Sequence, residues 1–308
     1  MRMPTEHPLV SICLPVRNGE EFLAETAESV LAQDHERLEL IISDNASDDR
    51  TEEICRKLTQ SDHRVRYHRQ QRNIGLLNNF AEVQRLARGE FFKWIGDDDW
   101  LAPAYLSCCL AAFDKDPRLI LVTTQQRYVS ADGMSQTLPY DRTELHSPQP
   151  DVRFAEMLRL LTESHLLLDP LYGLMRLPVV RRIPRRNMLR EDETFAATMA
   201  LAGPFGHVSE ILARRRTRPF TRLPVLAERL DVPRWRARMA TALQCRALLH
   251  AIEQAGLDPR QRRRARAAVA HLYLRRHLRT AISRRRKLTA MLAGRTGEQV
   301  RSLGRADG

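Results

Sequence analysis

The sequence predicts an α/β fold in which helices flank a mostly parallel β-sheet. Two observations support this fold class. Short apolar runs with strand character alternate with amphipathic helical segments over the first hundred residues, a pattern typical of a parallel sheet covered on both faces. Polar and acidic residues follow directly after three of the expected strands, and ligands of such sheets bind beyond the carboxyl ends of the strands. With 308 residues, the chain is long enough to bury a large core.

The first half of the sheet is expected within residues 9–95. Apolar runs predict strands over residues 9–16 and 38–42 and a short strand over 65–68. The aromatic-rich run 89–95 predicts a fourth, buried strand. Apolar residues at helical spacing separate these runs, and helices are expected over residues 22–31, 51–58 and 76–87.

The second half contains shorter and less regular elements. Residues 139–150 hold three prolines and are expected to form a loop that serves as a lid or an acceptor surface. The other expected elements are a helix over 104–113, strands over 119–123 and 126–129, a hairpin turn at Asp132-Gly133, a helix over 154–161, a strand over 171–176 and a helix that begins at residues 190–193.

Three consecutive carboxylates, Asp97, Asp98 and Asp99, follow the fourth expected strand directly. Like charges at this spacing repel one another, so such a cluster usually faces a cation. Oxygen-only ligands suit Mg²⁺ or Mn²⁺, and magnesium is typically held by one or two carboxylates while substrate phosphates complete its octahedron. The alternative is a solvated acidic turn that caps the following helix.

Polar groups at the other strand ends predict a ligand site beside these acids. If the strands are parallel, residues 15–18, 44–49 and 97–99 converge on one edge of the sheet. Asp44 lies directly at a strand end, where its carboxylate can accept hydrogen bonds from a base or a sugar. Asn73 and Gly75 form a turn, or Gly75 allows close approach of the backbone to a ligand. No Gly-x-Gly-x-x-Gly pattern follows the first strand, which excludes a classical dinucleotide site.

Four segments in this order and at these separations resemble the family 2 glycosyltransferases: residues 10–18, 40–48, 73–75 and 89–103. The resemblance covers roughly residues 8–220 and implies the GT-A fold. It also implies metal-dependent transfer of a sugar, with inversion, from a nucleotide-diphospho-sugar donor to an acceptor hydroxyl. The implied process is glycan, polysaccharide or glycoconjugate biosynthesis, with a glycan, a lipid-linked molecule or a small molecule as acceptor.

The resemblance also implies a role for each motif residue. Asp98 is the direct ligand of Mg²⁺ or Mn²⁺, and Asp99 is the next candidate. The metal motif of the family is usually Asp-x-Asp-Asp; alignment on Pro103 places its first Asp at Gly96, where this sequence departs from the family. The implied donor-binding residues are Pro15, Val16, Arg17, Asn18, Asp44, Asn73, Gly75 and Asp97, of which Asp44 accepts from the base and Asp97 faces the ribose or the metal shell.

The acidic segment Glu191-Asp192-Glu193 opens an expected helix. Acids interact favourably with a helix dipole at this end, which alone would explain them. The resemblance identifies Asp192 as the general base that removes the proton of the acceptor hydroxyl. Family members often place a metal-binding His after an Arg-rich strand, but segment 214–218 has no His. Arg216 or Arg218 is therefore expected to meet the diphosphate, unless Asp98 and solvent alone support the leaving group.

The charge of the chain is strongly segregated. Residues 211–308 hold 25 Lys and Arg against 6 Asp and Glu, whereas residues 1–210 hold 25 basic and 32 acidic residues. This asymmetry predicts a catalytic domain over residues 1–222 and a basic α-helical appendage over residues 223–308, with helices over 233–254 and 259–279 and a disordered end after residue 294.

The partner of the basic region is expected to be anionic. An anionic membrane surface or a phosphate-bearing acceptor fits amphipathic helices rich in arginine. The alternative is that the apolar stripes pack on the catalytic domain and leave only the arginines exposed. Nucleic acid is not expected as a partner, since the chain has no zinc-ligand spacing and no RNA-recognition motif.

Location and function class complete these expectations. The five cysteines have no metal or redox spacing, no apolar run is long enough to span a bilayer, and residues 1–8 have no signal-peptide core. A cytoplasmic protein, peripheral at the membrane if its basic region binds lipid, is expected.

A non-catalytic nucleotide-binding or scaffold protein stays open as the alternative, but the set Asp44, Asp98 and Asp192 favours an enzyme. A sugar nucleotidyltransferase is disfavoured because its Gly-rich, Lys-containing loop is missing.

Overall fold

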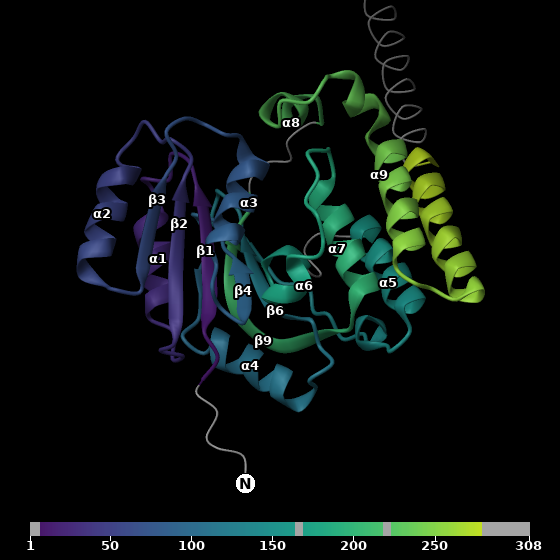
Figure 1. Cartoon of the computed structure of the whole chain (residues 1–308), viewed down its shortest axis with the longest axis horizontal. Coiled ribbons are helices and arrows are strands. Elements are labelled where there is room, and N and C mark those ends of the chain that lie inside the picture. The colour runs from purple at the N-terminus through teal and green to yellow at the C-terminus, as the bar shows by residue number, and fades with distance from the viewer. Residues whose placement is uncertain (1–6, 164–168, 218–222, 279–308) are drawn as a thin grey trace, which may run out of the picture.

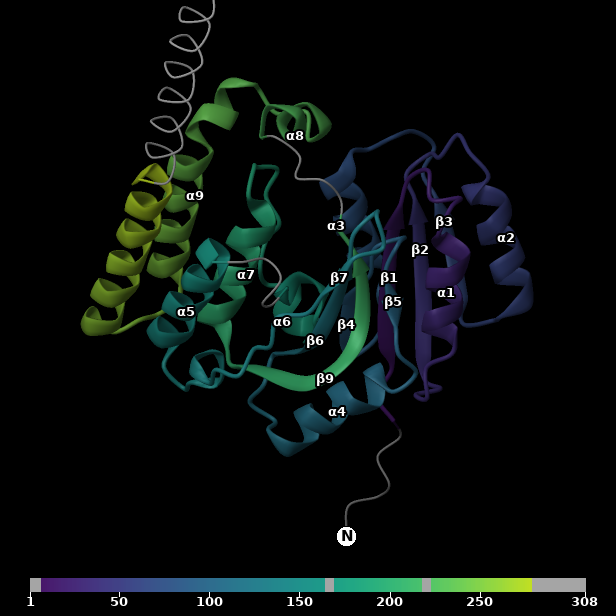
Figure 2. The ribbon, with the colours of Figure 1, turned by 180° about the vertical axis from the view of Figure 1, so that it is seen from behind.

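A nine-stranded sheet organises the protein, in the order β3-β2-β1-β4-β8-β6-β9-β5, with β7 paired to β6 (Figure 1). The computed structural model describes residues 7–163, 169–217 and 223–278. Helices cover both faces of the sheet, and the C-terminal helices lie beyond those of one face (Figures 1 and 2). The expected α/β class is confirmed.

The first four strands of the fold are parallel neighbours. They are β1 (Val10–Val16), β2 (Leu38–Asp44), β3 (Val65–Arg69) and β4 (Phe91–Trp94). Every residue of β1, β2 and β4 is buried, as expected for strands covered on both faces. Helices α1 (Leu23–Leu31), α2 (Thr51–Ser61) and α3 (Leu76–Leu86) connect them, so all the elements predicted before residue 95 are confirmed.

The remaining part of the sheet is mixed. β8 (Leu174–Arg176) runs antiparallel between β4 and β6 (Leu121–Val129), while β9 (Phe205–Arg216) is parallel to β6. The short strands β5 (Trp100–Leu101) and β7 (Ser135–Gln136) pair antiparallel with β9 and β6. The two strands predicted over 119–123 and 126–129 were wrong, because β6 is one continuous strand; the hairpin turn at Asp132-Gly133 is confirmed, with φ 82° at Gly133.

The helices of the second half begin with α4 (Tyr105–Lys115) and α5 (Pro150–Glu163). α5 starts earlier than the predicted residue 154, at a proline whose missing N–H is not needed in the first turn. The others are α6 (Leu177–Val180), α7 (Glu191–Ala202), α8 (Leu223–Arg229), α9 (Trp235–Gln254) and a helix over residues 259–278, with 3₁₀ turns at η1 (Glu144–His146) and η2 (Pro170–Tyr172).

Two apolar cores fill the two faces of the sheet. Helices α1, α2 and α4 pack on one face, and α3, α5 and α7 pack on the other. The second core extends into the basic region, since Leu248 and Ile252 of α9 and Val269 and Leu272 of the last described helix are almost fully buried in it. Part of each apolar stripe therefore packs on the rest of the protein. Met239 and Leu278 of the same stripes are exposed, so the arginines are not the only residues of these helices at the surface.

Helix α8 joins the two sides of the molecule above the sheet. A small apolar cluster contains Ala227 and Leu226 of α8 together with Leu77 of α3 and Leu189, which lies before α7. No helix of the described residues is long and apolar enough to cross a membrane. The expected disordered end after residue 294 lies outside the described residues.

Candidate functional site

The carboxyl ends of β1, β2 and β4 lie side by side because the three strands are parallel neighbours. The convergence predicted for these strand ends is therefore confirmed. Pro15 and Val16 end β1 and are buried, whereas Arg17 and Asn18 are exposed in the loop that follows. Asn18 has φ 56°, in the left-handed region that Asn adopts more readily than most residues.

Hydrogen bonds join the loops that follow β1 and β2. The Asn18 backbone N–H donates to Ser47 Oγ at 2.9 Å, and the Asp48 N–H donates to Asn18 Oδ1 at 3.1 Å. The Gly19 N–H donates to Thr51 Oγ1 at 2.9 Å. These reciprocal contacts hold the exposed segment of Arg17 and Asn18 in one position above the strand ends.

Asp44 is fully buried at the end of β2 and accepts four hydrogen bonds. Its Oδ1 accepts from the backbone N–H and the hydroxyl of Ser47 at 2.8 and 2.6 Å. Its Oδ2 accepts from the Tyr67 hydroxyl at 2.8 Å and from Arg69 Nη1 at 2.6 Å. Burial acts to raise the pKa of Asp44, but these bonds outweigh it and hold the pKa below its usual value. The carboxylate is thus a fixed anion, and Tyr67 and Arg69 belong to the same site.

Asn73 and Gly75 form a turn that is anchored to β2. The Asn45 side chain donates to Asn73 Oδ1 at 2.8 Å and accepts from the Ile74 N–H at 2.8 Å. Asn73 Oδ1 also accepts from the Gly75 N–H at 2.9 Å. Gly75 has φ 86°, and a Cβ placed on it would meet nothing within 4 Å, so the backbone conformation and not crowding requires a glycine here.

The three acids after β4 differ in their contacts. Asp99 is buried: its Oδ2 accepts from the Gly96 N–H at 3.0 Å, and its Oδ1 accepts from Arg215 Nε at 3.2 Å. Asp97 and Asp98 are half-buried. Thr26 of α1 donates to the carbonyl oxygens of Asp97 and Asp99 at 2.9 and 2.7 Å, which fixes the segment. Both oxygens of Asp99 are thus engaged within the protein.

The departure from the usual metal motif at Gly96 has a steric counterpart. A Cβ at this position would lie 3.0 Å from Asp99 Oδ2 and 3.3 Å from Asp98 Oδ1. An aspartate at position 96 would therefore crowd both neighbouring carboxylates.

The donor set fits a divalent cation that shares its ligands with a diphosphate. In the part of the chain that the structure describes, no group of three or more His, Cys, Asp or Glu side chains is arranged to hold a metal. Mg²⁺ does not require such a cage, because one or two carboxylates with phosphate oxygens and waters satisfy it. Asp98, half-buried at a strand end beside Asp97, meets this requirement.

Arg215 of β9 was not predicted from the sequence and joins two acids of the site. Its guanidinium forms ion pairs with Asp99, at 3.2 Å, and with Asp169. It also stacks on the Tyr172 ring, 3.6 Å from the ring centroid. The predicted Arg216 instead stacks on Phe22 at 3.9 Å, and Arg218 lies outside the described residues.

Lys93 was also missed and is buried beneath the acids. It donates to the Tyr172 carbonyl oxygen and lies 4.6 Å from the centroid of the Tyr105 ring. Burial lowers the pKa of Lys93 to about 8, while the charge of Asp99 opposes that shift. The signal available in the sequence was a lysine within an aromatic strand.

Glu191, the first acid of α7, is paired in the core. It forms an ion pair with Arg185, and both side chains are almost fully buried. The Arg185 guanidinium lies 5.0 Å from the Trp94 ring and 5.1 Å from the Phe195 ring. Burial raises the pKa of Glu191 to about 7, although Arg185 acts in the opposite direction. This carboxylate holds the start of α7 against β4.

Glu193, the third acid, connects α7 to the C-terminal helices. It accepts from Gln244 Nε2 at 2.8 Å and from Arg276 Nη2 at 2.6 Å, and it forms an ion pair with Arg190 at 2.9 Å. Arg190 has φ 63° at the residue before the helix, a sparsely populated conformation for a non-glycine residue. The charge of Glu193 is thus used in packing.

Asp192 lies between these two engaged acids and is exposed. No ion pair joins it to a basic side chain of the described residues. Protein surrounds it on most sides despite its contact with solvent, and the resulting desolvation, with the charge of Glu193, raises the pKa of Asp192 to about 6. A carboxylate with this pKa is well suited to accept a proton near neutral pH.

Asp169 links Asp192 to the acids at the strand ends. Its charge contributes to the raised pKa of Asp192, and Arg215 joins Asp169 to Asp99. The acidic strand end and the first turn of α7 therefore border one site.

Comparison with known proteins agrees with this geometry. Residues 11–177 match the model of the family described as glycosyl transferase family 2. The chain is 35% identical over 127 residues to a chondroitin synthase of Escherichia coli, covering 41% of this chain and 18% of that protein. It is 33% identical over 126 residues to a hyaluronan synthase of Pasteurella multocida, covering 41% and 13%. The chain spans about half the length, or less, of the curated relatives it matches.

Solved structures show the same fold. S. aureus TarS 1-349 in complex with UDP-GlcNAc superimposes with a TM-score of 0.63 at 17% identity, covering 87% of this chain and 72% of that one. The mannosyltransferase PcManGT from Pyrobaculum calidifontis, in complex with GDP-Man and Mn²⁺, gives a TM-score of 0.52 at 15% identity, covering 88% and 87%. The sheet and its flanking helices are thus GT-A-like, and the chain belongs to glycosyl transferase family 2.

Proposed function

We propose that the protein transfers a sugar, with inversion, from a nucleotide-diphospho-sugar to an acceptor hydroxyl in glycan, polysaccharide or glycoconjugate biosynthesis. The observation that carries this proposal is the difference in contacts among the three consecutive acids at the start of α7. Glu191 and Glu193 are paired with arginines, whereas Asp192 is exposed with a raised pKa. Among the described residues no arginine or lysine forms an ion pair with Asp192, and the charge of Asp169 acts on it from the side of the second acidic cluster.

The donor is expected to lie over the ends of β1 and β2. Asn73 and Gly75 line the proposed pocket of the base. Asp44 is fully buried and its oxygens accept from Ser47, Tyr67 and Arg69, so in the proposed complex the base takes the place of one of these donors on Asp44. Pro15, Val16, Arg17 and Asn18 border the nucleoside, and Asp97 faces the ribose or the metal shell. The support is the convergence of these loops and the hydrogen bonds that fix them.

The diphosphate is proposed to lie at the end of β4. Asp98 would hold Mg²⁺ or Mn²⁺ there, with Asp99 restrained by Arg215. A bound divalent cation would neutralise the diphosphate and so stabilise the leaving group. Mn²⁺ and GDP-Man are together in the PcManGT complex, which agrees with this assignment.

The chemical step uses the charge state of Asp192. At pH 7 a carboxylate with a pKa of about 6 is mostly ionised, so Asp192 can take the proton of the acceptor hydroxyl as that oxygen attacks the anomeric carbon. The bond from that carbon to the diphosphate oxygen breaks at the same time, on the opposite side. Attack by the acceptor itself, in one displacement, inverts the configuration.

The organisation and location of the protein belong to the same proposal. Residues 1–222 are proposed as the catalytic unit and residues 223–308 as a basic appendage, in a cytoplasmic protein that binds an anionic membrane surface. The burial of Leu248 and Val269 in the shared core means that the appendage also stabilises α7.

A donor-hydrolysis screen tests the proposal. The full chain would be incubated with UDP-, GDP- and dTDP-sugars in Mg²⁺ or Mn²⁺, and release of the nucleoside diphosphate would be measured. At least one donor should be hydrolysed slowly, with loss of turnover on chelation of the metal. Failure to bind or hydrolyse any nucleotide sugar would favour the non-catalytic alternative.

A further inference from the structure

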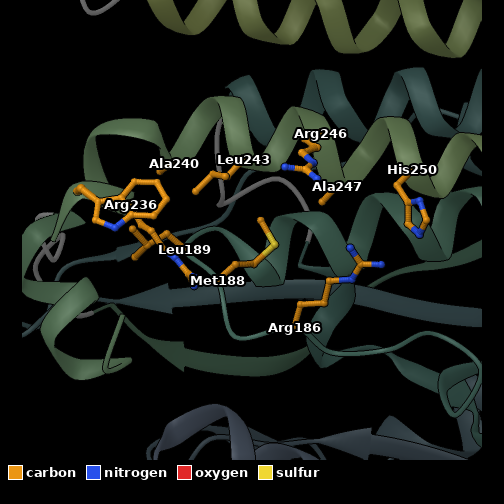
Figure 3. Close-up of a pocket in the computed structure, with 10 residues that line it drawn as sticks. Arg186, Met188, Leu189, Arg236, Ala240, Leu243, Arg246, Ala247 and His250 are labelled. Carbon is orange, nitrogen blue, oxygen red and sulfur yellow. The ribbon is translucent and has the colours of Figure 1, made fainter. Parts of the chain in front are cut away.

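A groove of about 510 Å³ lies between the segment before α7 and helix α9 (Figure 3). Met188 and Leu189 line it on one side, and Ala240 and Leu243 of α9 line it on the other. Trp235, at the start of α9, completes this apolar lining with 56% of its surface exposed. The described part of the chain therefore leaves an apolar strip open to solvent.

The charged residues that line the groove are all basic. Arg186 and Arg246 lie toward the end that His250 marks, whereas Leu189 lies toward the other end (Figure 3). No ion pair joins Arg186, Arg236 or Arg246 to a carboxylate of the described residues. The groove therefore has an apolar end and a cationic end whose arginines lack counter-charges.

This polarity fits a molecule that carries a phosphate group on an aliphatic chain. Arginine binds phosphate through two parallel hydrogen bonds, and such charge-assisted bonds are the strong ones. A soluble anion would leave the apolar strip exposed, and a neutral lipid would leave the arginines without counter-charges. Trp235 lies between an apolar surface and water, the position that tryptophan favours in contacts with lipid. Met239, 48% exposed, lies one helical turn from Trp235 and Leu243 and extends the apolar strip along α9.

One wall of the groove continues directly into the catalytic helix. Segment 186–189 is followed by Arg190, with φ 63°, and then by α7. A second hollow, of about 40 Å³, shares part of this segment with the groove and is also lined by Glu191 in the first turn of α7. Leu189 also belongs to the apolar cluster that contains Leu77 of α3. A ligand that restrains this wall therefore acts on the start of α7.

We propose that this groove binds one anionic phospholipid of the membrane, and that the bound lipid holds the segment before α7 in its observed position. The phosphate lies between Arg186 and Arg246, and one acyl chain lies on Leu243 and Trp235. The lipid is a regulatory ligand and not a substrate, because Asp192 does not line the groove. Its effect on transfer rests on the proposed function. General attraction of the basic region to a membrane is a different property, since the groove is a single site that one monomeric lipid can fill.

A soluble short-chain lipid tests the site. Dihexanoyl phosphatidylglycerol, below its micelle-forming concentration, would be titrated into the full chain while tryptophan fluorescence is recorded. The emission should shift to shorter wavelength and saturate, because the acyl chain removes Trp235 from water. Trp235→Phe should remove the shift, since Trp94 is already fully buried and Trp100 does not line the groove.

Two comparison probes separate the two recognised groups. Dihexanoyl phosphatidylcholine keeps the chains but should bind at least about tenfold more weakly, because its choline cation faces the same arginines. Glycerol 3-phosphate keeps the phosphate but lacks the chains, and it should cause no shift. Equal binding of phosphatidylcholine, or displacement of phosphatidylglycerol by an equal concentration of glycerol 3-phosphate, would overturn the proposal.

Charge reversal locates the site. Arg246→Glu should weaken the binding of phosphatidylglycerol at least about tenfold, because it removes a charged donor and adds a like charge. Arg238→Glu is the matched control, since Arg238 is exposed on the same helix but does not line the groove. Leu243→Asp should weaken binding by a similar factor, whereas Leu249→Asp, on the same helix but outside the groove, should not. Equal effects within either pair of variants would contradict binding in the groove.

A variant of the last described helix separates this site from general attraction to anionic surfaces. Arg260 and Arg263 are exposed on that helix and do not line the groove. Their combined reversal to Glu should leave the fluorescence shift with monomeric phosphatidylglycerol unchanged. A loss as large as that in Arg246→Glu would show that the net charge of the region binds the lipid, and the groove would have no specific role.

Rates of transfer to a soluble saccharide test the effect on α7. Saturating phosphatidylglycerol should raise the rate of the wild type about fivefold or more, the lower end of typical coupling between two sites. Arg246→Glu should have the wild-type rate without lipid and gain nothing from it. An inactive wild type would refute the proposed function, while the fluorescence titration would still decide whether the groove binds lipid. An unchanged rate at saturation of the fluorescence shift would refute the restraint on α7.

Discussion

The raised pKa of Asp192 predicts how the rate of transfer depends on pH. The base acts only when ionised, so kcat/KM should fall as the pH drops through about 6. For a single group with this pKa, the ionised fraction falls about tenfold between pH 7 and pH 5. A plot of log kcat/KM against pH should therefore rise with unit slope below pH 6 and level off above it.

Asp192→Asn isolates the group responsible. This variant should bind donor and metal as the wild type does, lose about 10²–10⁴-fold in transfer, and lose the limb near pH 6. Glu191 is the competing titratable group, because burial raises its pKa to about 7. Its pairing with Arg185 makes it structural, so any Glu191→Gln variant that folds should keep a limb near pH 6.

The measurement is initial rates of transfer from pH 4.5 to 8.5, with circular dichroism to confirm folding at each pH. Asp48→Asn serves as the control, since Asp48 is exposed in the loop after β2, away from α7. Retention of most of the transfer rate by Asp192→Asn, or survival of the acid limb in that variant, would place the base elsewhere.

Two further predictions concern the metal and the basic region. Asp98→Asn should abolish metal-dependent donor binding in calorimetry while Asp48→Asn retains it, and unchanged donor binding in Asp98→Asn would remove the metal role of Asp98. The full chain should co-sediment with anionic but not neutral vesicles, and salt should release it, because each arginine near such a surface contributes about 1 kcal/mol. Reversal of the exposed Arg260 and Arg263 to Glu should weaken this binding at least about tenfold, and co-sedimentation with neutral vesicles would contradict the model.

The parallel half of the sheet was predictable because its signals are local. Each strand is a short apolar run, and each is followed by its own polar turn, so the alternation with helices implied parallel strands. The position of Asp44 and Asp98 at one edge then followed from topology alone. The same reasoning failed for β6, which was predicted as two strands. The structure has a single strand there, in which a β-bulge after Thr124 shifts the register with β9.

Several site residues could not be predicted because their roles depend on distant pairing. Arg69 reaches Asp44 only because the β2–β3 register places the two residues opposite each other. Arg215 meets Asp99 from a strand more than a hundred residues away. Arg185 has a structural role because it stacks on Trp94 and forms an ion pair with Glu191. None of these arginines stands out in a chain so rich in arginine.

The charge distribution and the apolar core disagree on whether the C-terminal region is a separate unit. The net charge of the chain changes sign near residue 211, but the apolar core passes through that boundary without a break. Leu248 and Leu272 can be buried without burying unpaired charges, since the arginines of both helices lie at the surface or in ion pairs. A composition shift therefore marks a change in surface chemistry here and not the end of the core.

The contact of Arg276 with Glu193 predicts that the last described helix stabilises the catalytic helix. Arg276 is mostly buried, and its truncation removes the donor to Gln244 Oε1 and one of the donors to Glu193, which keeps Gln244 Nε2 and Arg190. We expect Arg276→Met to lower the free energy of unfolding by about 1–3 kcal/mol. Arg266→Met on the same helix should cost less than about 1 kcal/mol, because its ion pair with Glu253 is exposed.

A second readout separates this role from simple packing. The charge of Glu193 helps to raise the pKa of Asp192, and loss of Arg276 leaves that charge less neutralised. The acid limb of kcat/KM should therefore move to higher pH in Arg276→Met and to lower pH in Glu193→Gln. Urea denaturation and the pH profile of transfer measure the two effects. Equal destabilisation by Arg276→Met and Arg266→Met, with an unmoved acid limb, would show that the C-terminal helices do not act on Asp192.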